Sequence, residues 1–287
     1  MPIVSNFFAR IIARELQLSD EQWLEFLDGS SQSRDSVLWD NQMPLEEFNQ
    51  LLTNALRISG DPGLGLRFAR HSNLLAMGES GLAAITAPTI LEAIRSMGDY
   101  SRLQSDDFNI DIQVGQQQFE LRGQEHLAMG VTRRTQHEAL VLTIQNMLEM
   151  VLGRDLTEGR YYFAYPAPEY VERYSEVFHC PCEFDAKATG VDVPRSLCEF
   201  PSPYFDAVLW EQGRTRSVAL MQELNSLDNQ LHSRHILSVL RSQTPPLPSA
   251  ADMARAMNLS ERTLMRRLGD EQNTYRQLQN CVLEEWA

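Results

Sequence analysis

The sequence is 287 residues long, with 43% hydrophobic residues, 22% charged residues and a formal net charge of −14. This length and apolar content allow one large and one small domain, each with its own core, and they exclude a disordered chain. The N-terminus lacks the pattern of a secretory signal, and no apolar run approaches the roughly 20 residues of a membrane span, so we expect a soluble, cytoplasmic protein.

The first 60 residues predict three helices, because apolar residues recur on one face of each segment and a helix-starting residue precedes it. These starts are Ser5, the capping box of Ser19 with Gln22, and Pro44. The turn-forming residues Asp61-Pro62-Gly63 follow the third helix.

Residues 89–202 predict a mixture of helices and strands. Thr89 and Glu92 form a capping box ahead of one helix, and alternating apolar residues around Gly115 predict a hairpin. An apolar helix is expected at 137–152 and an amphipathic one from Pro168. Short strands are expected at 161–163, at 182–184 and around Val191. Because helices and strands do not alternate regularly, we expect residues 1–202 to form an α+β domain.

Residues 203–232 predict a linker helix with a leucine stripe. Its leucines are spaced four, three and four residues apart, as in a short coiled-coil seam. They are Leu220, Leu224, Leu227 and Leu231. One interpretation is that this seam pairs two protomers into a dimer. The alternative is that the stripe docks on its own domain.

Residues 233–287 predict an all-α helix-turn-helix segment. The stretch 244–248 contains three prolines and cannot continue a helix. Ser249 then caps a short helix, 258–260 form a turn, and Ser260 caps a second helix whose Leu264 and Leu268 point inward. The alternative is an ordinary helical hairpin whose arginine side chains simply face solvent.

The inward leucines fix the outward face of the second helix. Arg262, Met265 and Arg266 then point away from the core, where the N-terminal part of a recognition helix contacts base edges in the major groove. The residues better suited by type to phosphate contacts are Ser260, Thr263, Arg267, Tyr275 and Arg276.

Two parts of the chain resemble the AraC family of transcription regulators. Residues 260–268, with Tyr275-Arg276-Gln277-Leu278 and Glu284-Glu285-Trp286-Ala287, are similar to its first helix-turn-helix and the start of its linker helix. Residues 60–66, 81–82 with 87–93, and 178–184 resemble the arabinose-binding-like N-terminal domain of a subgroup that includes ornithine-utilisation and virulence regulators. The resemblance implies a DNA-binding regulator whose N-terminal domain is regulatory.

The sequence departs from the family pattern in three places. Gln272 stands where relatives usually have glycine, and Leu283 where arginine is common. Relatives also continue into a second helix-turn-helix, so we expect a chain that lacks this unit. The acidity lies in the front domain, since residues 232–287 hold seven Arg against six Asp and Glu.

We find no pattern typical of a catalytic, cofactor or metal site. His179-Cys180-Pro181-Cys182 with Cys198 invites a soft-metal interpretation. The alternative, which we favour, is that these cysteines pack as small hydrophobes around a buried strand. The four cysteines of the chain, with Cys281, do not suggest disulfides. We therefore expect no enzyme activity.

Two modes of control remain open. In the first, a small-molecule effector, apolar to amphipathic or resembling an amino acid, binds residues 1–202 and changes how a homodimer sits on promoter DNA. In the second, protein partners act through the acidic front domain and no small ligand is involved.

Overall fold

The computed structural model describes residues 3–72, 77–105, 107–125, 129–241, 246–257, 259–271 and 273–285. The chain forms two compact units, Pro2–Ala219 and Leu220–Ala287. Helix α9, Ala207–Arg241, begins in the first unit and ends in the second. Each unit has its own hydrophobic core. No helix within the described ranges combines the length and apolar content needed to cross a bilayer.

The N-terminal unit is mainly helical. Its α-helices are α1 (Asn6–Leu16), α2 (Asp20–Leu27), α3 (Arg34–Trp39), α4 (Leu45–Ser59), α5 (Leu64–Phe68), α6 (Gly78–Ile85), α7 (Ile90–Tyr100) and α8 (Arg133–Leu152), followed by the start of α9. Its 3-10 helices include η1 (Ala69–His71), η3 (Ser101–Leu103), η4 (Gly130–Thr132), η5 (Val171–Glu176) and η6 (Arg195–Leu197).

The strands of this unit form two sheets. A two-stranded sheet pairs β1 (Ile3–Ser5) with β2 (Gln42–Pro44). The larger sheet has the order β3-β4-β7-β5-β6, and its strands are β3 (Phe108–Val114), β4 (Gln118–Glu125), β7 (Thr189–Pro194), β5 (Arg160–Tyr162) and β6 (Cys182–Glu183). Neighbours are antiparallel except β5 and β6. The predicted hairpin is therefore β3 with β4.

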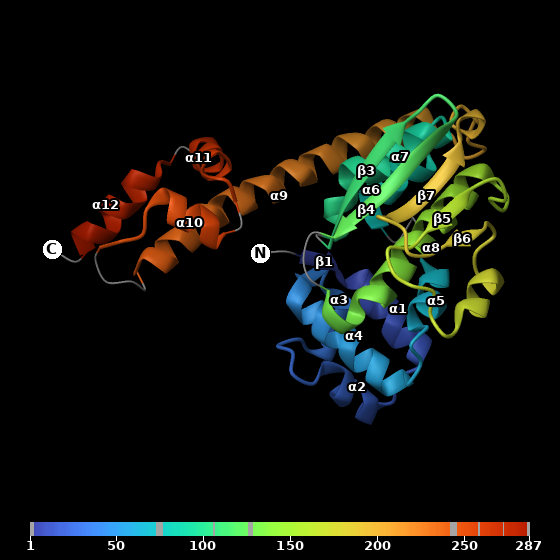
Figure 1. Ribbon diagram of the computed structural model, residues 1–287, viewed down its shortest axis with the longest axis horizontal. Coiled ribbons are helices and arrows are strands. Elements are labelled where there is room, and N and C mark those ends of the chain that lie inside the picture. The colour runs from blue at the N-terminus through green and yellow to red at the C-terminus, as the bar shows by residue number, and fades with distance from the viewer. Residues whose placement is uncertain are drawn as a thin grey trace. The chain divides into compact units, whose positions relative to one another are not determined.

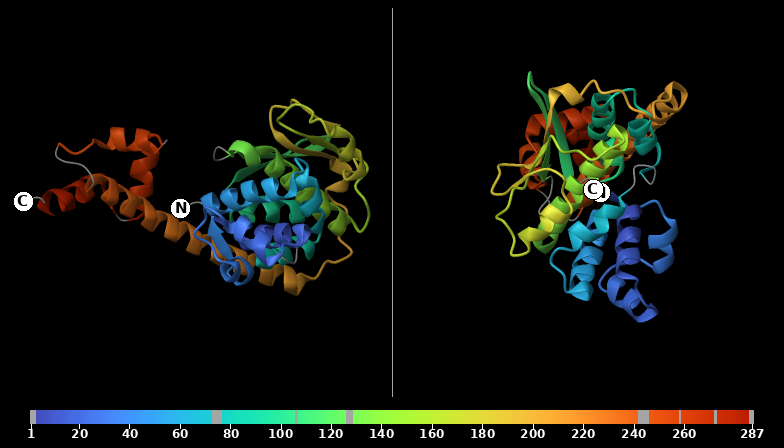
Figure 2. Two further views of the ribbon diagram at one scale, coloured as in Figure 1. Left: turned by 90° about the horizontal axis from the view of Figure 1, so that it is seen from below. Right: turned by 90° about the vertical axis from the view of Figure 1, so that its right-hand side faces the viewer.

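The N-terminal helices and the larger sheet lie at opposite ends of this unit. Figures 1 and 2 show α1 to α4, coloured blue, at one end and the green to yellow strands at the other, with α8 between them. Helix α8 contacts α5, α6 and α7 as well as β7. Because it is surrounded by other elements, α8 is buried on most of its surface, including its polar residues 135–138.

Local capping explains why the first helices start where they do. The Ser5 and Ser19 side chains each accept a hydrogen bond from a backbone amide of the first turn, and Gln22 completes the capping box of α2. The Thr89 side chain caps α7 by accepting from the Glu92 amide. The predicted capping box is only half formed, because the Glu92 carboxylate pairs with Arg95 and not with the Thr89 backbone.

Three local predictions are corrected by the structure. Helix α8 begins at Arg133, four residues before the predicted start at 137. The segment after Pro168 is the 3-10 helix η5 and not an α-helix. Helix α3, which starts with its own capping box at Ser33, was not predicted. The α+β class of the front domain, followed by a helical segment, is confirmed.

The C-terminal unit is all helical. After the end of α9 it contains α10 (Ala250–Ala256), α11 (Glu261–Asp270) and α12 (Tyr275–Glu285). All four helices contribute to one core. Its buried residues are Ile236, Leu240, Met253, Ala254, Leu264, Leu268, Tyr275, Leu278 and Val282.

Candidate functional site

Helices α10 and α11 lie where the sequence predicts a helix-turn-helix. The Ser249 hydroxyl caps α10 by accepting from the Asp252 amide at 3.2 Å, and the Ser260 hydroxyl caps α11 by accepting from the Thr263 amide at 3.1 Å. Between them, the Leu259 amide donates to the Ala254 carbonyl at 2.8 Å and its side chain packs on the core. Asn258, the first residue of the predicted turn, lies outside the described residues.

The face of α11 away from the core carries the three residues expected to contact bases. Leu264 and Leu268 are completely buried against α10, whereas Arg262, Met265 and Arg266 are exposed. Met265 is an apolar side chain on the same face, and 43% of it is exposed. The structure therefore brings two guanidinium groups and one thioether to a single accessible face.

The residues expected to contact phosphates have varied surroundings. Ser260 is exposed and hydrogen-bonded to the Thr263 hydroxyl at 2.7 Å, while Arg276 is exposed at the start of α12. Arg267 is half-buried, with one guanidinium nitrogen 2.7 Å from Nε2 of His232.

Tyr275 is only 3% exposed, and its hydroxyl donates to the Pro248 carbonyl at 2.9 Å. A phosphate oxygen also needs a donor, so the predicted phosphate contact of Tyr275 requires that this hydrogen bond be given up.

A polar cluster that the sequence analysis missed holds the end of α11 to α9. The Ser233 amide donates to Oε2 of Glu271 at 3.1 Å, and the Asn273 side chain donates to the Ser233 hydroxyl at 3.3 Å and to the Glu271 carbonyl at 3.0 Å. Burial raises the pKa of Glu271. This cluster sets the orientation of α11 relative to the part of α9 that belongs to the same unit.

The leucine stripe of α9 is described only in part. Leu220 and Leu224 are half-buried, and the side chains of Leu227 and Leu231 lie outside the described residues. The dimer seam therefore stays a prediction.

The N-terminal unit contains a cavity of about 110 Å³ whose wall is mostly apolar. It lies among α1, α4, α5, α7, α8 and β3, and representative wall residues from these six elements are Phe8, Leu52, Phe68, Met97, Leu140 and Phe108. The sequence analysis named no ligand-binding residues. Helical periodicity assigns these side chains to the hydrophobic core. The local sequence, however, does not distinguish a filled core from a core that contains a cavity.

Polar side chains on the cavity wall are mostly hydrogen-bonded to their neighbours. The Gln104 amide nitrogen donates to the Met77 carbonyl at 2.9 Å and to the Ser80 hydroxyl at 3.1 Å. The Thr143 hydroxyl donates to Ser72 at 3.1 Å. The exception is Gln136 on α8, whose Oε1 is buried without a hydrogen-bond partner.

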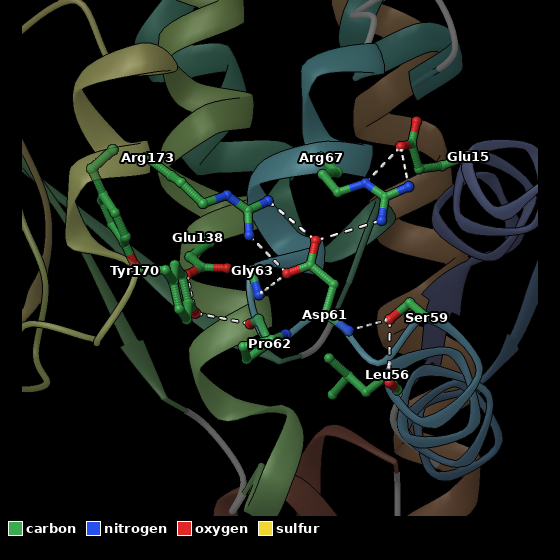
Figure 3. Close-up of polar contacts among 11 residues, drawn as sticks. Glu15, Leu56, Ser59, Asp61, Pro62, Gly63, Arg67, Glu138, Tyr170 and Arg173 are labelled. Atoms are coloured by element: carbon green, nitrogen blue, oxygen red, sulfur yellow. Dashed lines mark hydrogen bonds and ion pairs between the residues drawn. The ribbon is translucent and has the colours of Figure 1, made fainter.

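A second polar cluster, drawn in Figure 3, surrounds the turn at residues 61–63. The Asp61 carboxylate accepts from the Arg173 guanidinium at 2.7 Å and from the Gly63 amide at 2.9 Å, and it lies 3.5 Å from Arg67. Hydrogen bonding by Arg173 lowers the pKa of Asp61 more than its burial raises it. This network joins the turn between α4 and α5 to η5.

Glu138 of α8 lies behind this turn and is fully buried. Its Oε1 accepts hydrogen bonds from the hydroxyls of Tyr170, at 2.8 Å, and Tyr174, at 2.7 Å, while Oε2 has no partner among the described residues. Burial raises the pKa of Glu138 to about 7 in spite of these bonds. Gly65 makes room for the carboxylate, because a Cβ at that position would lie 2.5 Å from Oε2.

The histidine-cysteine stretch does not converge on a common point. The Cys180 thiol donates to the Leu156 carbonyl at 2.9 Å, and burial raises the pKa values of Cys180 and Cys182. Cys180, Cys182 and Cys198 are free thiols. In the described part of the chain, the group of donor atoms close enough to share an ion is Glu149, Asp155 and His179, which includes no cysteine.

Comparison with known proteins gives three consistent matches. Residues 34–202 match the family model of the arabinose-binding domain of AraC transcription regulators. The ornithine utilization regulator of Pseudomonas aeruginosa is 26% identical over 241 residues, which are 84% of this chain and 70% of the relative. The crystal structure of the transcriptional regulator CdpR from Pseudomonas aeruginosa covers 95% of this chain and 82% of its own, with a TM-score of 0.54 and 21% identity, and so shares its fold.

Proposed function

This chain belongs to the AraC family of transcription regulators that carry an arabinose-binding N-terminal domain, and from this premise we propose that it reads promoter DNA under the control of a small effector. In this proposal, the C-terminal unit supplies the DNA contacts and the N-terminal unit binds the effector. The protein acts by binding and not by catalysis.

The exposed face of α11 carries the DNA-reading part of the proposal. Arg262 and Arg266 project from a helix whose opposite side is fixed by buried Leu264 and Leu268. Arginine can form two parallel hydrogen bonds to O6 and N7 of guanine, and Met265 between them can contact a thymine methyl group.

Contacts to phosphates complete the proposed interface. The Ser260 start of α11 and the Thr263 beside it offer hydroxyl groups near a helix N-terminus, where the helix dipole favours an anion. Arg267 on α11 and the exposed Arg276 at the start of α12 add positive charge. These contacts set position and general affinity, but they carry no base preference.

We extend the proposal to assembly and control. Two protomers pair through the stripe of Leu220, Leu224, Leu227 and Leu231 on α9, a spacing that is typical of a coiled-coil seam. The mostly apolar cavity of the N-terminal unit supports a small, largely apolar effector over control by protein contacts alone.

Base-resolved selection from a random DNA library tests the reading face. We expect Arg266→Ala, and likewise Arg262→Ala, to weaken binding to the selected site by about 1–3 kcal/mol and to relax preference at one or two base positions. Arg255→Ala is the matched control, since Arg255 is an exposed arginine on α10 that pairs with Asp252. An unchanged selection profile for both α11 variants would contradict the proposed face.

The effector arm is tested separately on the purified protein. Native mass spectrometry is expected to find a co-purified small molecule, or calorimetry a metabolite that binds. If neither method finds one and a partner protein alters DNA binding, control by protein contacts replaces control by a ligand.

A further inference from the structure

Gln136 borders the cavity and carries a buried hydrogen-bond acceptor, Oε1, that is not used by the described residues. This atom has almost no accessible surface, so a ligand reaches it only when the side chains around it move. Gln136 is 4% exposed, and its amide nitrogen donates to Oδ1 of Asn49 at 2.9 Å and to the Thr132 hydroxyl at 2.6 Å. Both amide protons are therefore engaged. Among the residues that the structure describes, none donates to the Oε1 atom.

The orientation of the Gln136 amide is fixed by Thr132. The Thr132 hydroxyl donates its own proton to the Met129 carbonyl at 2.7 Å, so toward Gln136 it can only accept. If the Gln136 amide were rotated by 180°, its Oε1 would face the Thr132 hydroxyl oxygen, and two hydrogen-bond acceptors would lie against each other. The unpartnered atom is thus the carbonyl oxygen, a group that costs free energy when it is buried without a donor.

The rest of the wall limits the kind of molecule that fits. The described wall residues include no arginine, lysine or histidine, and Asp107 is their one carboxylate. An anionic ligand would therefore lack a counter-charge. The Gln104, Ser80 and Thr143 side chains already donate to protein atoms, so they offer few further donors to the oxygen atoms of a sugar.

Size sets a further limit. An apolar cavity of about 150 Å³ holds one benzene molecule, and this cavity measures about 110 Å³. A six-membered ring thus needs a modest widening. Met77 and Met97 on the wall can supply it, since methionine side chains change shape at low cost.

We propose that this cavity binds an uncharged, mainly apolar small molecule that donates one N–H or O–H hydrogen bond to Oε1 of Gln136. This inference rests on the proposed function in taking the ligand to be the effector. Gln136 is the residue that determines specificity, and the apolar wall supplies most of the affinity.

Phenol, toluene and benzoate are suitable probes, because they share one ring and differ in donor and charge. Affinities are measured by NMR titration of the full-length protein. Phenol and toluene are expected to bind the wild type, and benzoate is not. In Gln136→Leu, the ratio of the toluene Kd to the phenol Kd is expected to fall about tenfold, the equivalent of about 1.4 kcal/mol for one satisfied acceptor.

Two further variants serve as controls. Thr143→Val removes from the same wall a hydroxyl group that already has a hydrogen-bond partner. It should leave the ratio of the toluene Kd to the phenol Kd unchanged. Ala139→Leu fills the cavity and should abolish binding of both rings. If Gln136→Leu fails to fold, the side-chain amide resonance of Gln136 in the wild type decides: it should shift with phenol and stay in place with toluene.

The proposal is overturned by an unchanged ratio in Gln136→Leu, by benzoate binding as tightly as phenol, or by ring binding that survives Ala139→Leu. These readouts do not involve DNA. If the probes bind as expected but the affinity for DNA does not change, the binding site stands and its role as an effector site is refuted. If none of the three probes binds but Arg266→Ala still alters the DNA selection profile, the proposed site is refuted and the proposed DNA-reading function stands.

Discussion

Replacing Glu138 by glutamine should change how the stability of the N-terminal unit depends on pH. The carboxyl group is fully buried, and in place of a charged partner its Oε1 accepts hydrogen bonds from Tyr170 and Tyr174. Arg134 and Arg173 lie near enough to lower its pKa, but burial outweighs them. Glutamine keeps the shape and the acceptor while removing the titration.

The size of the effect follows from the pKa of Glu138, which burial raises from 4.5 to about 7. Below pH 4.5 the carboxyl group is protonated in both the folded and the unfolded chain. As pH rises toward 7, the unfolded chain loses this proton first, so the free energy of unfolding falls. A shift of this size corresponds to about 3 kcal/mol between the two plateaus, at 1.36 kcal/mol per pKa unit.

The neighbouring His137 has the opposite pH dependence. Burial lowers its pKa from 6.5 to about 4, so between these values the unfolded chain binds the proton and the folded chain does not. Its contribution to stability therefore rises with pH over that window. In the wild type the two effects largely cancel. In Glu138→Gln the His137 effect remains, and the free energy of unfolding should rise between pH 4 and pH 6.5.

Urea unfolding at a series of pH values from 4 to 8 measures this. Tryptophan fluorescence follows mainly the N-terminal unit, which contains three of the four tryptophans, Trp23, Trp39 and Trp210. The difference between Glu138→Gln and the wild type should grow with pH in favour of the variant. The exposed Glu176→Gln is the control and should follow the wild type. A difference for Glu138→Gln that is constant from pH 4.5 to pH 8 would refute the reasoning.

Three other substitutions test separate features. Arg276→Ala should weaken binding to all DNA sequences alike and reduce the salt dependence of affinity by about one phosphate contact, as measured by fluorescence anisotropy at several salt concentrations. Leu224→Glu should give a folded monomer by light scattering, and a dimer that survives would place the interface elsewhere. Gly190→Ala should destabilise the N-terminal unit by several kcal/mol in urea unfolding, because a Cβ there would overlap the Leu121 carbonyl of β4, and wild-type stability would contradict this.

Features encoded by neighbouring residues were predicted well from the sequence. The caps at Ser5, Ser19, Thr89, Ser249 and Ser260 are all present, because each depends on a side chain and an amide two or three residues away. The exposed face of α11 was also predicted, since two buried leucines fix the rotation of a short helix. Its contacts with DNA stay a prediction.

Features that depend on distant residues were not predicted. Strand β1 is three residues long and pairs with β2, some 40 positions away, so neither has a local signal of its own. The sheet order, with β7 between β4 and β5, also results from such long-range pairing. The cavity was missed for the same reason, because elements far apart in sequence, from β1 to α8, line it.

The three successive polar residues at 136–138 of α8 are difficult to explain by folding alone. Neighbouring residues of an α-helix point about 100° apart, and these three reach Asn49 on α4, Thr189 on β7 and the tyrosines of η5. Each is buried, and two of them keep an oxygen without a donor. Apolar residues would pack here at lower cost.

This cost is understandable if α8 is the element through which a ligand affects its unit. A molecule bound to Gln136 satisfies one of the two unused oxygens and so stabilises the folded state by an amount that grows with its concentration. Gln136 belongs to α8, the helix that also contacts β7 through His137 and η5 through Glu138. Protection of α8, β7 and η5 amides from hydrogen exchange should therefore increase together when a ligand binds, whereas protection confined to the cavity wall would show that α8 does not transmit the effect.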